Sequence, residues 1–166
     1  MYRKISDFIE DWEQEFQSTK NLIALLSDNE LNFSPSKNIR PIGDLVFHIV
    51  GTPGTLITEM GFSNNMLNWY SDSIESIERL IENFVKSNIE LIDIISKWTD
   101  NDLEKEVSVL GDSYKKGYIL STLLIGHQAH HRGQLTILMR LKNLKLIEMY
   151  GPTYETWVEM GEEPMK

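Results

Sequence analysis

The amino-acid sequence predicts an all-α protein: a four-helix bundle with a long, hairpin-containing link before the last helix and a C-terminal tail. Long segments carry apolar residues at three- and four-residue steps, the spacing that gives a helix one buried face. One short segment alternates around a tight-turn pattern, and no strand pattern is sustained. Helices with apolar stripes bury them against one another, so four of them indicate a bundle. The 166 residues fill one core, and we expect a single domain over residues 1–166.

The first helix is expected from about Asp7 to Ser27. Asp7 and Glu10 resemble a capping box at its start. The residues of its apolar stripe are Phe8, Ile9, Trp12, Phe16, Ile23 and Leu26. A run of turn formers, residues 27–41, then separates this helix from the second one.

The second helix is expected to begin near Pro41, because proline suits the first turn of a helix. The residues of its apolar stripe are Ile42, Leu45, Val46, Ile49 and Val50. Further along, Pro53 has no amide hydrogen to donate to Ile49, and Gly54 adds backbone freedom. A kink or an interruption just after His48 is therefore expected.

The second half of the chain supplies two more helices and the link between them. The third helix is expected from about Asp72 to Thr99, with apolar residues close to a 3.5-residue repeat. From Leu103 to Tyr118 the pattern alternates, with Gly111 and Asp112 placed for the turn of a small hairpin or an extended loop. The fourth helix follows from about Ile119 to Leu141, and the aromatic tail after it is expected to pack over one end of the bundle.

Composition excludes several classes of function. The formal net charge is −9, and phosphate backbones are bound mainly by clustered Lys and Arg, so we expect no nucleic-acid partner. No apolar run approaches the roughly 20 residues that span a bilayer, and the N-terminus lacks the apolar core of a signal peptide. We therefore expect a cytoplasmic protein without a membrane partner. The chain has no cysteine, so any metal must be held by nitrogen and oxygen.

Three of the four histidines lie in the stretch GHQAHHRGQL, residues 126–135. On an ideal helical wheel, His127 and His131 fall in the middle of the buried stripe formed by leucines, and His130 falls at its edge. Arg132 and Gly133 point further away on the same wheel. Buried imidazoles need partners for their ring nitrogens, and burial favours the neutral form that binds metal. The i, i+4 pair therefore indicates a metal site.

A third ligand is wanted, and the remaining histidine is His48 on the second helix. The wheel of that helix places His48 at the edge of its apolar stripe, although the Pro53 irregularity would re-aim it. The alternative is that His127 and His131 are core histidines bonded to carboxylates or backbone. Gln134 suits either a place beside the metal or a polar contact within the bundle.

At these residues the sequence resembles a known family. The stretch HQAHHRGQL is similar to the H-x-x-x-H-R-G-Q motif of the DinB family, and DLVFHIVG is similar to that family's earlier histidine. The resemblance covers the whole chain in element order. It implies that His48, His127 and His131 hold a divalent metal, commonly zinc or nickel, and that His130 is a neighbour without a ligand role. It assigns no chemical role to Arg132.

The resemblance also implies an activity. Related proteins include bacillithiol and mycothiol S-transferases, in which a metal lowers the pKa of a thiol that attacks an electrophile. The expectation is thus a metal-dependent, S-transferase-like enzyme acting on a small molecule with a low-molecular-weight thiol, and a homodimer. The alternatives are a metal-dependent hydrolase, which lacks a glutamate beside the ligand pair, and a non-catalytic metal-binding stress-response protein. No catalytic side chain is assigned.

Overall fold

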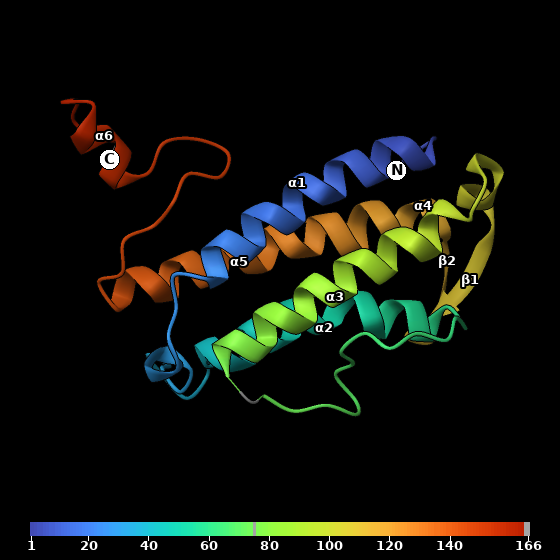
Figure 1. Ribbon diagram of the computed structural model, residues 1–166, viewed down its shortest axis with the longest axis horizontal. Coiled ribbons are helices and arrows are strands. Elements are labelled where there is room, and N and C mark those ends of the chain that lie inside the picture. The colour runs from blue at the N-terminus through green and yellow to red at the C-terminus, as the bar shows by residue number, and fades with distance from the viewer. Residues whose placement is uncertain (75, 165–166) are drawn as a thin grey trace.

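The computed structural model describes residues 1–74 and 76–164, and four long helices dominate it (Figure 1). They are α1 (Ile5–Ile23), α2 (Ile42–Glu59), α3 (Ile77–Ser96) and α5 (His127–Leu141). Helix α3 packs against α1 and α2, and α5 packs against the same two helices from the other side. The expected all-α bundle is confirmed. Within the described residues, no helix is long and apolar enough to cross a membrane.

The core lies where the apolar stripes of these helices meet. Its fully buried side chains include Phe8, Trp12, Ile49, Phe84, Leu91, Leu120, Leu124 and Leu135. Trp12 of α1 also donates through Nε1 to the Asn88 side-chain oxygen of α3, at 2.8 Å. Helix α3 begins at Ile77 with a Ser76 cap, so it starts later than the predicted Asp72; Glu75 of that prediction lies outside the described residues.

Helix α2 continues through Pro53 without the predicted interruption. The missing amide of Pro53 leaves the carbonyl of Ile49 without its helical donor. The side-chain amide of Gln128, on α5, donates to this carbonyl at 3.4 Å. A neighbouring helix thus supplies the hydrogen bond that proline removes, and the bond ties α5 to α2 one residue from His48.

The loop after α2 returns along the same helix. Two glycines of α2, Gly51 and Gly54, allow the close approach, because a Cβ on either would collide with Trp69 or with the Leu67 carbonyl. The amide of Trp69 donates to the Thr55 hydroxyl at 3.1 Å. Trp69 is therefore held against α2 near His48.

The link before the last helix contains the predicted hairpin. A short 3₁₀ turn, η2 (Asp100–Glu104), leads into strands β1 (Glu106–Val109) and β2 (Asp112–Lys115), which pair antiparallel. The turn falls on Leu110 and Gly111, both with positive φ, rather than on Gly111 and Asp112. The register explains the difference, because Asp112 pairs with Val109 and so belongs to the strand. Another 3₁₀ turn, η1 (Asp28–Glu30), follows α1.

The last helix is not the single α-helix expected from Ile119. It begins with α4 (Lys116–Tyr118), widens into a π-helical stretch, η3 (Ile119–Gly126), and continues as α5. A π turn holds about one residue more than an α turn, which rotates all following residues by about 100° about the axis. The predicted wheel therefore misplaces the polar residues after Gly126, although Leu135 and Leu138 are buried as it predicted. The rotation buries Gln128 and Arg132, and it moves the histidines from the middle of the buried stripe to its edge.

The tail turns back past the end of α5 toward α1 (Figure 1). Leu144, Leu146 and Met149 pack against the core as expected. The short helix α6 (Tyr154–Glu159) has no buried residue and is joined to α5 by the Arg140–Glu155 ion pair, at 2.5 Å. The tail therefore packs on the core through Leu144, Leu146 and Met149, and α6 adds no buried residue to it.

Candidate metal centre

Three imidazoles converge where α2 and α5 face each other. His127 Nε2 lies 3.1 Å from His48 Nε2 and 3.0 Å from His131 Nε2. All three side chains are partly buried, and one nitrogen from each lies within 4.8 Å of the others. Each histidine sits at the edge of the buried face of its own helix, so packing the two helices brings the edges together. The structure thus joins the three residues that the sequence singled out.

The three imidazoles are neutral at physiological pH. Burial, with smaller contributions from neighbouring charges, lowers the pKa of His48 to about 3 and the pKa of His127 to about 4. Burial also lowers the pKa of His131. A lowered pKa leaves the ring nitrogens unprotonated and able to donate lone pairs to a metal.

Hydrogen bonds at the far side of two rings select the tautomer. His131 Nδ1 lies 2.7 Å from the Gln134 side-chain oxygen and so carries the proton that it donates. His127 Nδ1 lies 3.4 Å from the Thr52 hydroxyl, which itself donates to the His48 carbonyl at 2.7 Å. The Thr52 oxygen is then the acceptor for His127. Both rings present an unprotonated Nε2 to the cluster, as metal-binding histidines do.

Trp69 fixes the third ring. Its indole stacks on His48 with ring centroids 4.3 Å apart, and its Nε1 donates to the His48 carbonyl at 2.9 Å. No sequence pattern pointed to Trp69, because it lies in a loop without periodicity. Thr52 was equally hidden, although its place one turn after His48 puts both on the same face of α2.

The cluster fits a metal ion. Zinc–imidazole bonds of about 2.0–2.1 Å in a tetrahedron separate ligand nitrogens by about 3.3 Å, close to the two short separations seen here. The two unprotonated nitrogens, His127 Nε2 and His131 Nε2, lie 3.0 Å apart and repel one another unless a cation lies between them. His130 takes no part: its ring is exposed, and its Nε2 accepts from the Gln134 amide at 3.1 Å. The three-histidine cluster can therefore hold a metal ion of unspecified identity.

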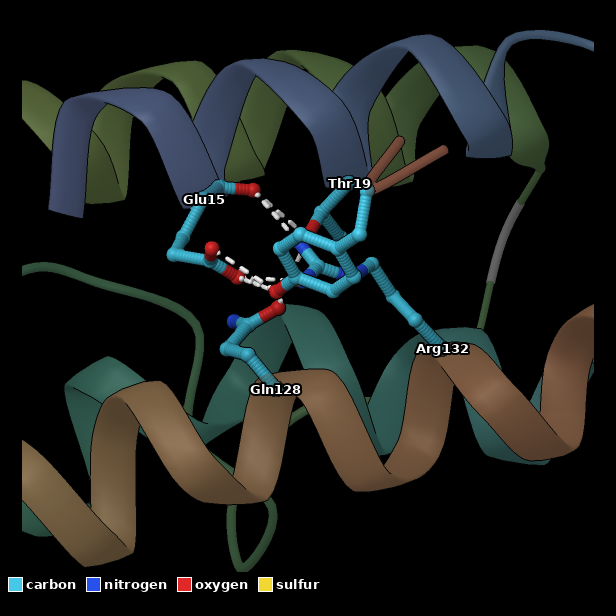
Figure 2. Close-up of polar contacts among 5 residues, drawn as sticks. Glu15, Thr19, Gln128 and Arg132 are labelled. Atoms are coloured by element: carbon cyan, nitrogen blue, oxygen red, sulfur yellow. Dashed lines mark hydrogen bonds and ion pairs between the residues drawn. The ribbon is translucent and has the colours of Figure 1, made fainter. Parts of the chain in front are cut away.

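Next to the histidines on α5, Gln128 and Arg132 point into the bundle and form a buried polar network with α1 (Figure 2). Arg132 is 1% exposed and forms an ion pair with Glu15 of α1. Its guanidinium also donates to the Glu15 carbonyl at 3.0 Å and to the Thr19 hydroxyl at 3.1 Å. Thr19 in turn lies 3.1 Å from the Gln128 side-chain oxygen. The wheel that placed Arg132 away from the core missed this network, because the wheel ignored the π turn.

The tail completes the network. The hydroxyl of Tyr150 donates to the Glu15 carboxylate at 2.7 Å, and the Arg132 guanidinium lies over the Tyr150 ring at 5.2 Å from its centroid. Because Gln128 bonds both Thr19 and the Ile49 carbonyl, one chain of contacts runs from α1 through α5 to α2. This chain fixes the rotation of α5 and hence the direction of its histidines.

Comparison with known proteins identifies the family. The model of the DinB family matches residues 1–164. The chain belongs to the DinB family. It is 28% identical over 172 residues to the uncharacterized protein YrdA of Bacillus subtilis strain 168, and the match covers 100% of this chain and 99% of that protein.

Solved DinB-like structures share the fold. A DinB-like protein from Bacillus cereus ATCC 10987 superposes with a TM-score of 0.82 at 28% identity, covering 90% of this chain and 100% of that one. The DinB-like protein YjoA from B. subtilis gives a TM-score of 0.65 at 16% identity over 96% of this chain and 99% of its own. The second likeness supports the DinB fold alone.

The Arg132 network yields a prediction about stability. Replacing Arg132 with Met leaves the Glu15 carboxylate without its buried counter-charge, so we expect a loss of about 3–5 kcal/mol in the free energy of unfolding. Arg140→Met is the matched control, because it removes a more exposed ion pair on the same helix and should cost about 1 kcal/mol or less. Urea denaturation measures both, and equal losses in the two variants would contradict a special role for the network.

The lowered histidine pKa values predict how zinc binding depends on pH. Protons compete for the ring nitrogens only near or below each pKa, so a lowered pKa moves zinc release to more acidic pH. We expect the zinc affinity to change little between about pH 8 and pH 6.5 and to fall steeply only well below the usual histidine pKa of about 6.5. Competition with a chromophoric chelator measures this, and a steep fall already between about pH 7.5 and pH 6.5 would refute it.

Proposed function

We propose that this DinB family protein is a metal-dependent enzyme that transfers a low-molecular-weight thiol to an electrophilic small molecule. His48, His127 and His131 would hold the metal, with zinc or nickel as the candidates that suit imidazole ligands. The proposal rests on the convergence of three neutral imidazoles, with one nitrogen from each within 4.8 Å of the others, beside an open cavity. Three protein ligands are typical of catalytic sites, which keep a coordination position for water or substrate.

The metal, when bound, supplies a positive charge that lowers the pKa of a coordinated thiol. The chain's own residues hold the rings in place: Thr52 and Gln134 keep the protons of His127 and His131 on Nδ1, and Trp69 covers one face of His48. In the transfer, the sulfur forms a bond to the electrophilic carbon, the leaving group departs with the bonding pair, and the thiol proton passes to solvent.

The surroundings of the cluster favour thiol transfer over hydrolysis. Hydrolysis at such a site usually employs a carboxylate as general base. In the described part of the chain, the side chains that bond to or stack on the three imidazoles are Thr52, Trp69, Gln134 and histidine rings, none of them acidic. A thiol with a lowered pKa loses its proton without such a base.

The test is a turnover assay with the metal-loaded protein. Zinc- and nickel-loaded samples are mixed with monochlorobimane and, in turn, bacillithiol, mycothiol or glutathione, and fluorescence reports the new carbon–sulfur bond. We expect metal-dependent turnover with at least one thiol, abolished in His131→Ala and retained in His130→Ala, whose ring lies outside the cluster. The proposal is contradicted if the rate with every thiol equals the uncatalysed rate. If the same sample also hydrolyses esters, the activity is hydrolysis.

A further inference from the structure

A cavity of about 560 Å³ opens beside the histidine cluster, between the loop before α2 and the outward face of α5. His131 forms part of its wall, so the cavity and the candidate metal centre are continuous. Its other walls include Ile39, Arg40, Leu45, Gln134, Ile137 and Leu141. We refer to this cavity as the α5 groove.

The groove leaves large apolar side chains open to water. Ile39 is 44% exposed, Ile137 is 62% exposed and Leu141 is 55% exposed. Exposed apolar surface gathered in a concave site is typical of a ligand-binding pocket. The groove therefore suits the aliphatic part of a small molecule whose reacting atom lies at the histidines.

Arg40 is the one formally charged residue among the described residues that line the groove. No carboxylate of the described chain lies within ion-pair distance of it, although the chain holds 25 acidic residues against 16 basic ones. It shares the wall of the cavity with His131, which places it beside the cluster. An unpaired guanidinium on the wall of an apolar groove is a recognition site for an anion.

A neutral polar side chain on the same wall, Gln134, is already engaged. The Gln134 oxygen accepts from His131 and its amide donates to His130. It therefore orients a candidate ligand histidine, and one of its two amide hydrogens is already used. Arg40 is the charged group of this wall, and it would bind an anion through the two parallel hydrogen bonds that a guanidinium makes with a carboxylate.

We propose that the α5 groove binds a thiol co-substrate that carries a carboxylate, and that Arg40 is the specificity-determining residue that binds this carboxylate. Ile137 and Leu141 contact the aliphatic atoms between the carboxylate and the sulfur. The inference deepens the proposed function, on which it rests for placing the sulfur at the histidines. A net charge of −9 repels anions in general, so a local cation is what admits this one.

The test compares two thiols of the same size. Cobalt-substituted protein is titrated with 3-mercaptopropionate and with 3-mercaptopropanamide, and the thiolate-to-cobalt absorption band gives both dissociation constants. We expect the carboxylate to bind about tenfold tighter or more, as for a charge-assisted pair. In Arg40→Gln the two constants should become equal. In Lys37→Gln, which removes a charge from the same loop outside the groove walls, the preference should persist.

A second arm separates this inference from the proposed function. Isotope-labelled zinc-loaded protein is titrated with 4-methylpentanoate, which has no thiol, and the methyl signals of Ile137 and Leu141 are followed by nuclear magnetic resonance. Arg40-dependent shifts, without any thiolate band in the first arm, would support carboxylate binding in the α5 groove. They would also reject thiol binding at the histidines. A preference for the carboxylate that is unchanged in Arg40→Gln, or no binding in either arm, would overturn the inference.

Discussion

The rotational setting of α5 against α2 is the constraint on which the candidate site depends. Two features fix it: the π-helical stretch Ile119–Gly126, which turns α5 by about 100°, and the hydrogen bond from Gln128 to the Ile49 carbonyl. This bond replaces the backbone donor that Pro53 lacks. The Ile49 carbonyl of α2 is therefore satisfied by a side chain of α5. Because this contact lies beside His48 and His127, the histidines meet wherever it forms.

The residues of the α5 motif divide between two faces of the helix. Gln128 and Arg132 point into the bundle, where they bond α1 and α2. His127 and His131 point toward α2, at the edge of the same buried face. The polar core thus fixes the helix, and the fixed helix aims the imidazoles. Nothing in the structure explains a glycine at position 133, since a Cβ there would meet no atom within 4 Å.

Sequence patterns predicted the elements and the buried faces of the first two helices, and they misplaced the polar residues of the last helix. The four helices, the hairpin and the three-histidine set follow from periodicity, turn residues and the family motif, because these signals are local. The π turn has no such signal: the run from Ile119 to Ile125 is mostly apolar, with Ser121 and Thr122 inside it, and carries no mark of an extra residue per turn. The wheel therefore centred His127 and His131 and turned Arg132 outward.

The remaining differences arise from contacts between segments distant in sequence. Pro53 predicted a break in α2, because it leaves the Ile49 carbonyl without a donor. Gln128 of α5 donates to that carbonyl instead, and the helix continues. Trp69 reaches His48 across a loop whose path depends on two glycines in α2. Arg40 becomes part of a cavity wall only because α5 forms the other side of the groove. Such pairings depend on the packed bundle and leave no periodic trace in the chain.

The most direct measurement of the central claim is the metal content of protein purified without a histidine tag. The native chain, His131→Ala and His130→Ala are each reconstituted with zinc, freed of unbound metal and analysed by mass spectrometry of the elements. A metal site formed by His48, His127 and His131 should give close to one zinc per chain in the native protein and in His130→Ala, and almost none in His131→Ala. Equal zinc in both variants, or no zinc in the native chain, would contradict it and leave the three histidines as a polar contact between two helices.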